Sequence, residues 1–137
     1  MAVLIDTSLL IDRERSGRLA DSIASEDIAI SVITVSELLQ GVERATGDQR
    51  ARRQAIVEHL LSAFEPIPIT TAVARVHAGL WAYLATRGQM IGAHDLWIAA
   101  TALAHGFGVA TLNRHEFERV PGLRLIEPLD GAGRGIR

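Results

Sequence analysis

The chain has 137 residues, the size of a single domain, and its 48% share of hydrophobic residues is enough to build a core. Fourteen basic residues against sixteen acidic ones give a net charge of −2, so no global positive charge attracts a polyanion. The chain contains neither cysteine nor lysine, which excludes disulfides, thiolate nucleophiles, Schiff-base chemistry and the phosphate-binding lysine of a Walker A loop. No apolar run is long enough to span a membrane, and we expect a cytoplasmic protein.

Short apolar runs alternate with helical patterns along the chain. In chain order, the sequence predicts a strand at 2–5, a short helix or turn at 9–11, a helix at 18–24, a strand at 28–31, amphipathic helices at 34–45 and 48–64, a brief strand at 67–69, helices at 70–86 and 95–105, and strands at 109–112 and 123–126. Such alternation is typical of parallel crossover connections.

The predicted fold is therefore α/β, with helices on both faces of a mostly parallel sheet of four to five short strands. We expect one domain over residues 1–128 and a glycine-rich tail at 129–137. In such sheets, ligands bind beyond the carboxyl ends of the strands. That edge is where we look for chemistry.

Several polar side chains are predicted to meet at this edge. Asp6 follows the first strand directly, and Asn113 and Glu116 follow a later strand. Glu37 and Asp95 lie near the starts of helices, which should begin close to the same edge. One pocket can therefore collect all of these side chains, although Asn113 is also a common turn residue and Glu116 an ordinary surface residue.

The other three acids have structural explanations too. Asp6 is a favoured helix cap, Thr34 and Glu37 fit a capping box, and Asp95 in a first helical turn is favoured by the helix dipole. The combination is more informative, because two carboxylates about 4 Å apart repel by roughly 4 kcal/mol at an effective dielectric near 20. A cluster of them needs protons or a hard cation such as Mg²⁺ or Mn²⁺.

Four segments of the sequence resemble the PIN-domain ribonucleases, most closely the VapC type, the toxin half of a VapBC toxin–antitoxin module. They are Leu4-Ile-Asp6-Thr-Ser-Leu-Leu-Ile11, Ser31-Val-Ile-Thr-Val-Ser-Glu37-Leu, His94-Asp95-Leu-Trp-Ile-Ala-Ala and Val109-Ala-Thr-Leu-Asn113-Arg-His-Glu116-Phe. They occur in the family's order, and the resemblance extends from Val3 to about Ile126. It implies a PIN-like three-layer α/β/α sandwich.

The resemblance also implies a Mg²⁺-dependent or Mn²⁺-dependent endoribonuclease toxin of a type II toxin–antitoxin system. The family's catalytic acids fall on Asp6, Glu37 and Asp95, which would hold the metal, and Glu116 stands where the family usually has Asp. Metal-activated water would attack the RNA phosphodiester in line and leave a 5′-phosphate and a 3′-hydroxyl.

Supporting roles and partners follow from the same resemblance. Thr7 matches a small hydroxyl residue that can hydrogen-bond a carboxylate or the metal-bound water, and Asn113 matches the polar residue at a strand end. Arg114 lies beside Asn113 and is a candidate to contact the RNA, either transfer RNA or ribosomal RNA. The implied partners are a VapB-type antitoxin, a second copy in a homodimer, and the toxin–antitoxin hetero-oligomer.

Two other functions stay open. In a catalytically inactive PIN-like protein-binding module the acids would serve as caps, and Glu116 in place of Asp is the hint; metal binding discriminates. A phosphoaspartate-type phosphatase is suggested by Asp6, but Ser8 stands where its second Asp belongs and the chain has no lysine. The amphipathic helices at 34–45 and 48–64 offer a groove for an antitoxin, or pack in the core or in a homodimer.

Overall fold

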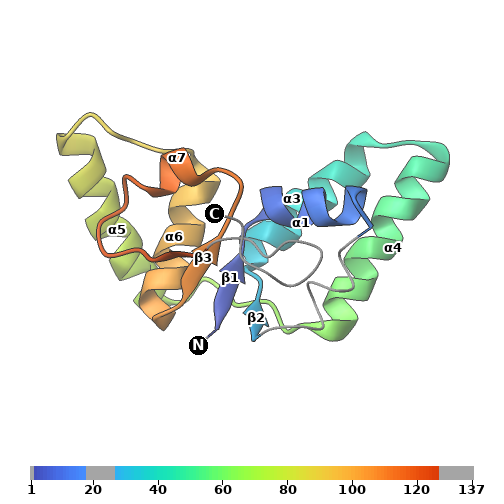
Figure 1. Ribbon diagram of the computed structural model, residues 1–137, viewed down its shortest axis with the longest axis horizontal. Coiled ribbons are helices and arrows are strands. Elements are labelled where there is room, and N and C mark those ends of the chain that lie inside the picture. Colours follow the sequence, from blue (N-terminus) through green and yellow to red (C-terminus); the bar gives the residue numbers. More distant parts are fainter. Residues whose placement is uncertain (1, 18–26, 127–137) are drawn as a thin grey trace.

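A computed structural model of the chain describes residues 2–17 and 27–126. Its centre is a parallel sheet with the strand order β2-β1-β3-β4 (Figure 1). The strands are β1 (Val3–Ile5), β2 (Ile28–Ala29), β3 (Gly108–Ala110) and β4 (Leu125–Ile126). The helices of the described residues are α1 (Thr7–Arg15), α3 (Val32–Arg44), α4 (Gly47–Ala63), α5 (Thr71–Thr86), α6 (Ala93–His105) and α7 (Arg114–Phe117).

Helices cover both faces of this sheet. Figure 1 shows α5 and α6 on one side of the strands and α1, α3 and α4 on the other. Successive strand residues point to opposite faces, so Leu4 and Val109 pack in the core beneath α5 and α6, whereas Ile5 and Ala110 pack with α1. The predicted three-layer α/β/α sandwich with a parallel sheet is confirmed.

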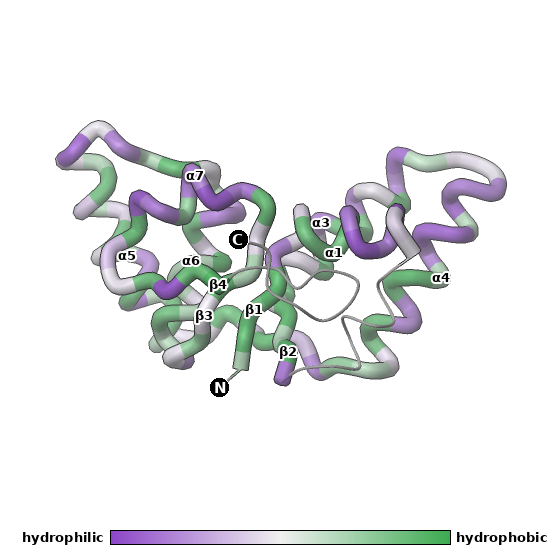
Figure 2. The backbone as a smooth tube through the Cα atoms, viewed as in Figure 1, coloured by the Kyte–Doolittle hydropathy of each residue, from purple (hydrophilic) through white to green (hydrophobic). Residues whose placement is uncertain are grey.

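The register of the strands brings distant parts of the sequence together at one edge. Val3 pairs with Gly108, and Ile5 with Ala110. The Asp6 amide continues this ladder and donates a 2.9 Å hydrogen bond to the Ala110 carbonyl. Since the strands are parallel, the residues that follow β1 and β3 lie side by side. Figure 2 shows the change in character: the strands are green and hydrophobic, and α7 beyond β3 is purple.

Two predicted elements differ in kind from the observed ones. The turn or short helix predicted at 9–11 is part of the nine-residue helix α1, because Asp6 caps a helix that begins earlier, at Thr7. The predicted strand at 67–69 is reduced to a single bridge between Ser31 and Ile67, since Pro66 and Pro68 on either side have no amide hydrogen to donate.

Other differences concern helix starts. Helix α3 begins at Val32 and helix α6 at Ala93, each two residues before the predicted start. The helix predicted at 18–24 and the tail predicted at 129–137 lie outside the described residues. Among the helices that the structure describes, none is long and apolar enough to cross a membrane.

Gly108 offers a test of the packing between β3 and β4. A Cβ at this position would lie 2.7 Å from Ile126 Cγ1 and 3.2 Å from the Arg124 carbonyl oxygen. We predict that Gly108→Ala lowers the free energy of unfolding by about 1–3 kcal/mol, the usual cost of overpacking. Chemical denaturation measures this change.

The control is Gly79→Ala in the middle of α5, where a Cβ meets no atom within 4 Å. This substitution should raise the stability by about 0.5–1 kcal/mol, because alanine has the better helix propensity. Equal effects of the two substitutions would contradict the tight contact between β3 and β4.

Candidate active site

Asp6 is the most buried carboxylate of the site, with 3% of its surface exposed. Its Oδ1 accepts a 2.8 Å hydrogen bond from the Thr7 amide, which makes it the N-cap of α1. Its Oδ2 accepts hydrogen bonds from the hydroxyls of Thr111 (2.7 Å) and Ser8 (2.9 Å). Burial raises the pKa of Asp6 above its usual range, and these three donors oppose that shift.

Glu37 does not close the capping box that the sequence suggests. Helix α3 begins two residues earlier, with Ser31 as its N-cap, whose hydroxyl accepts a 3.0 Å hydrogen bond from the Ile33 amide. Thr34 therefore lies inside the helix, and the predicted cap between Thr34 and Glu37 is wrong. Glu37 Oε1 instead accepts a 2.8 Å hydrogen bond from the Thr7 hydroxyl, on the helix that Asp6 caps.

The second oxygen of Glu37 also has a partner. His94 Nδ1 lies 3.3 Å from Glu37 Oε2, and both side chains stay partly exposed. The Glu37 carboxylate is thus held from two sides, by Thr7 of α1 and by His94 of α6. Two elements far apart in the sequence fix its position at the sheet edge.

The carboxylates of Asp95 and Glu116 both accept hydrogen bonds from the side-chain amide of Asn113. Asn113 Nδ2 donates to Asp95 Oδ2 at 2.9 Å and to Glu116 Oε2 at 3.0 Å. Burial, together with the neighbouring Glu116 and the charge of Asp6, raises the pKa of Asp95 to about 7, although the Asn113 hydrogen bond opposes the shift. The hydrogen bond with Asp95 lowers the pKa of Glu116. The two opposite shifts favour protonation of Asp95 over protonation of Glu116.

The predicted site residues form two groups around Asp6. One group links Asp95, Asn113 and Glu116 through hydrogen bonds, and the other links Glu37 to Thr7. Asp6 couples to both groups electrostatically, because Glu37 raises its pKa and its own charge raises the pKa of Asp95. Within the described ranges, no three acidic or histidine side chains are close enough together to ligate one ion.

Some residues of the site were not singled out by the sequence. Thr111 and Ser8 hold Asp6, and His94 holds Glu37. Thr111 was detectable in principle, because it is a hydroxyl residue directly after a buried strand. Arg114 is half-buried in α7, and its contact with RNA stays a prediction.

The donor set fits a hydrated divalent cation. All the donors are hard oxygens, and burial, with a smaller contribution from neighbouring acidic groups, raises the pKa values of Asp6 and Asp95. Mg²⁺ retains several waters and needs only one or two direct carboxylates, so it does not require three ligands in contact. A cation would take the place of a proton on Asp95.

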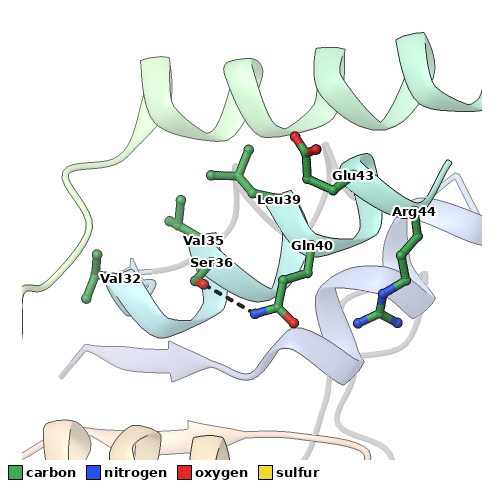
Figure 3. A pocket seen from close by; sticks show the side chains of 7 residues that line it. All are labelled: Val32, Val35, Ser36, Leu39, Gln40, Glu43 and Arg44. Atoms are coloured by element: carbon green, nitrogen blue, oxygen red, sulfur yellow. Dashed lines mark hydrogen bonds between the residues drawn. The ribbon is translucent and has the colours of Figure 1, made fainter. Parts of the chain in front are cut away.

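Two pockets lie near α3. The larger, about 500 Å³, lies on the exposed face of α3 and contains none of the carboxylates described above (Figure 3). It is lined by Val32, Val35, Ser36, Leu39, Gln40, Glu43 and Arg44. A second pocket, about 260 Å³, lies between α1, α3 and α4, and Glu37 forms part of its wall. The second pocket therefore shares Glu37 with the acidic site.

Comparison with known proteins identifies relatives along most of the chain. Residues 3–123 match the PIN domain family. Ribonuclease VapC1 of Rickettsia felis is 35% identical over 92% of this chain and 96% of its own length. The tRNA(fMet)-specific endonuclease VapC of Salmonella typhimurium is 38% identical over 72% of this chain and 73% of its own. The structure of DNA-bound VapBC from Salmonella typhimurium contains a chain with a TM-score of 0.81 and 31% identity, covering 91% of this chain and 96% of that one.

The raised pKa of Asp95 predicts how stability depends on pH without metal. Its folded value of about 7 lies above the ordinary 3.8, so the folded state binds more protons between these values and loses stability as pH rises through them. We predict that Asp95→Asn is more stable than the wild type by about 1 kcal/mol at about pH 8, after allowance for solvent screening, and that the gain largely disappears at about pH 4.

Urea unfolding with a chelator present measures this difference. Asp12→Asn on the exposed side of α1 is the matched control and should show no such pH dependence. An Asp95→Asn protein that is less stable than the wild type at the higher pH would contradict the charge crowding inferred here.

Proposed function

Because the chain belongs to the VapC ribonucleases of the PIN-domain family, we propose that it is a metal-dependent endoribonuclease toxin. The observation that carries the metal dependence is the arrangement of Asp6 and Asp95 at the carboxyl edge of the parallel sheet. Both carboxylates have raised pKa values, and the charge of one raises the pKa of the other. A divalent cation that takes the place of a proton here would stabilise both carboxylates.

Each side chain has a defined part in this proposal. Asp6 and Asp95 would hold Mg²⁺ or Mn²⁺, with Glu37 in direct contact or through water. The bound cation would supply Lewis-acid polarisation of the phosphodiester and lower the pKa of an attacking water. Thr111 and Ser8 orient the Asp6 carboxylate, and their hydrogen bonds favour its ionised form against the cost of burial.

Glu37 is suited to receive the proton of the attacking water. Thr7 occupies Oε1 and His94 approaches Oε2, which fixes the carboxylate plane and leaves the remaining lone pairs to accept a proton. Asn113 holds Asp95 and Glu116 together, so the longer Glu116 acts through Asp95 and through water. The expected products are a 5′-phosphate and a 3′-hydroxyl, because water is the nucleophile.

Transfer RNA is the first substrate to test. The Salmonella relative is named a tRNA(fMet)-specific endonuclease, and ribosomal RNA is the other class to compare. Proteins that read RNA sequence usually contact single-stranded loops, whose bases are accessible. We propose that this chain cleaves such a loop.

We further propose a VapB-type antitoxin as protein partner. The Salmonella neighbour is a VapBC structure, with toxin and antitoxin together. The carboxylates around Asp6 would attract an arginine or lysine side chain of such a partner, which would compete with the metal. A homodimer and a toxin–antitoxin hetero-oligomer complete the proposed assembly.

The cleavage assay tests the catalytic proposal. With saturating Mg²⁺, the wild type should cut RNA, and a chelator should abolish the reaction. Asp6→Asn and Asp95→Asn should each lower kcat by at least about 100-fold, since each removes charge that stabilises the metal and the transition state. Gel electrophoresis of labelled RNA and end-group analysis measure the rate and the products.

Asp12→Asn is again the control, because it removes the same charge from the exposed side of α1. Circular dichroism shows whether each variant is folded. Full activity in either site variant would rule out the assigned role of that carboxylate. Products with a 2′,3′-cyclic phosphate would rule out water as the nucleophile.

A further inference from the structure

The pocket between α1, α3 and α4 has one wall in the acidic site. Glu37, which Thr7 and His94 hold at the catalytic edge, also lines this pocket of about 260 Å³. Helix α1 leads away from Asp6 for nine residues, roughly 13 Å at 1.5 Å per residue, and ends at Arg15 on the same pocket. The pocket and the acidic site therefore share Glu37, and α1 runs from Asp6 to the arginine at the pocket.

The charge of this pocket is opposite to that of the acidic site. Three arginines line it, Arg15, Arg44 and Arg53, against two glutamates, Glu14 and Glu37. One of these glutamates is already engaged by Thr7 and His94. The pocket thus presents a positive surface directly beside a cluster of carboxylates, in a chain whose net charge is −2.

Two of the three arginines have their guanidinium groups available. Arg15 and Arg44 lie exposed in the last turns of α1 and α3, where cations are favoured by the helix dipole. Neither makes a hydrogen bond or ion pair within the described residues. Arg53 differs, because its Nη1 donates to the Gly41 carbonyl at 2.9 Å and this bond fixes its half-buried side chain.

The remaining wall is apolar. The pocket is also lined by Leu10 and Ile11 of α1, Leu38 of α3 and Ile56 of α4. A nucleotide matches this combination, because its base is a flat, largely apolar group and its phosphate is an anion that arginine binds well. Arginine guanidinium planes can also stack on bases.

We propose that this pocket binds a nucleotide of the RNA adjacent to the scissile phosphate, with its phosphate at Arg15 and Arg44 and its base against the apolar wall. This inference rests on the proposed ribonuclease function and adds a substrate subsite to it. The pocket positions RNA across the carboxylates, which by themselves repel a polyanion. Positive charge beside the site compensates for that repulsion.

The test compares two double variants that remove the same charge. Arg15→Gln/Arg44→Gln removes the two available arginines of the pocket. Arg50→Gln/Arg52→Gln removes two exposed arginines of α4 that do not line it. Arg50 pairs with Glu43, and Figure 3 shows Glu43 directed toward α4 while Arg44 leaves α3 on another side.

Binding is measured with a fluorescein-labelled single-stranded RNA of about 12 nucleotides, by anisotropy in the presence of a chelator. The pocket variant should bind about tenfold more weakly. Its plot of log affinity against log salt should be shallower by about 0.7, because both arginines contact one phosphate and each neutralised phosphate on a single strand contributes about 0.7. In Mg²⁺ its KM should rise while kcat at saturating RNA stays the same. The α4 variant should stay within about twofold of the wild type.

Two results would overturn the subsite. If the pocket variant binds RNA with the affinity and salt dependence of the wild type, the pocket does not bind RNA, and a protein segment becomes its expected ligand. If the α4 variant loses as much RNA affinity as the pocket variant, the loss reflects the overall charge of the protein and not the pocket. Failure of the proposed function has a different signature: the wild type would then cleave no RNA in Mg²⁺, whatever the binding of the two double variants.

Discussion

Carboxylates that repel one another are held at one edge of a small parallel sheet, and most of the architecture serves to keep them there. The pairing of β1 with β3 places Asp6 beside the segment that follows Ala110. That segment carries Thr111, which bonds Asp6, and Asn113, which bonds Asp95 and Glu116. The hydrogen bonds offset part of the repulsion, and protonation of Asp95, whose pKa is raised, would offset more.

The same constraint explains the roles of the helices. Helix α1 begins at the site because Asp6 caps it, and its Thr7 holds Glu37 of α3. Helix α6 begins there with His94 and Asp95, and its apolar middle is buried against the sheet. The carboxylates of the site therefore belong to elements held by packing elsewhere, which keeps a site of like charges organised.

The sequence predicts the elements that follow simple patterns. The parallel sheet, the long helices and the edge where the acids gather follow from alternation of apolar runs and from the positions of Asp6 and Asn113 after strands. The sequence does not distinguish Ser31 from Thr34 as the N-cap of α3, because both residue types suit that position; in the structure the N-cap is Ser31. That choice releases Glu37 from a local cap and turns it toward Thr7 and His94, contacts between residues at least 30 positions apart.

The central claim is that Asp6 and Asp95 belong to one cation site. Calorimetric titration with Mn²⁺ of the wild type, Asp6→Asn, Asp95→Asn and the Asp12→Asn control tests it most directly. We predict binding in the wild type and the control, with proton release near neutral pH as the cation displaces the proton on Asp95, and loss of binding in both site variants. If either site variant is folded and binds Mn²⁺ as strongly as the wild type, the two carboxylates do not share a cation site. The substituted carboxylate would then serve only the helix start at which it lies.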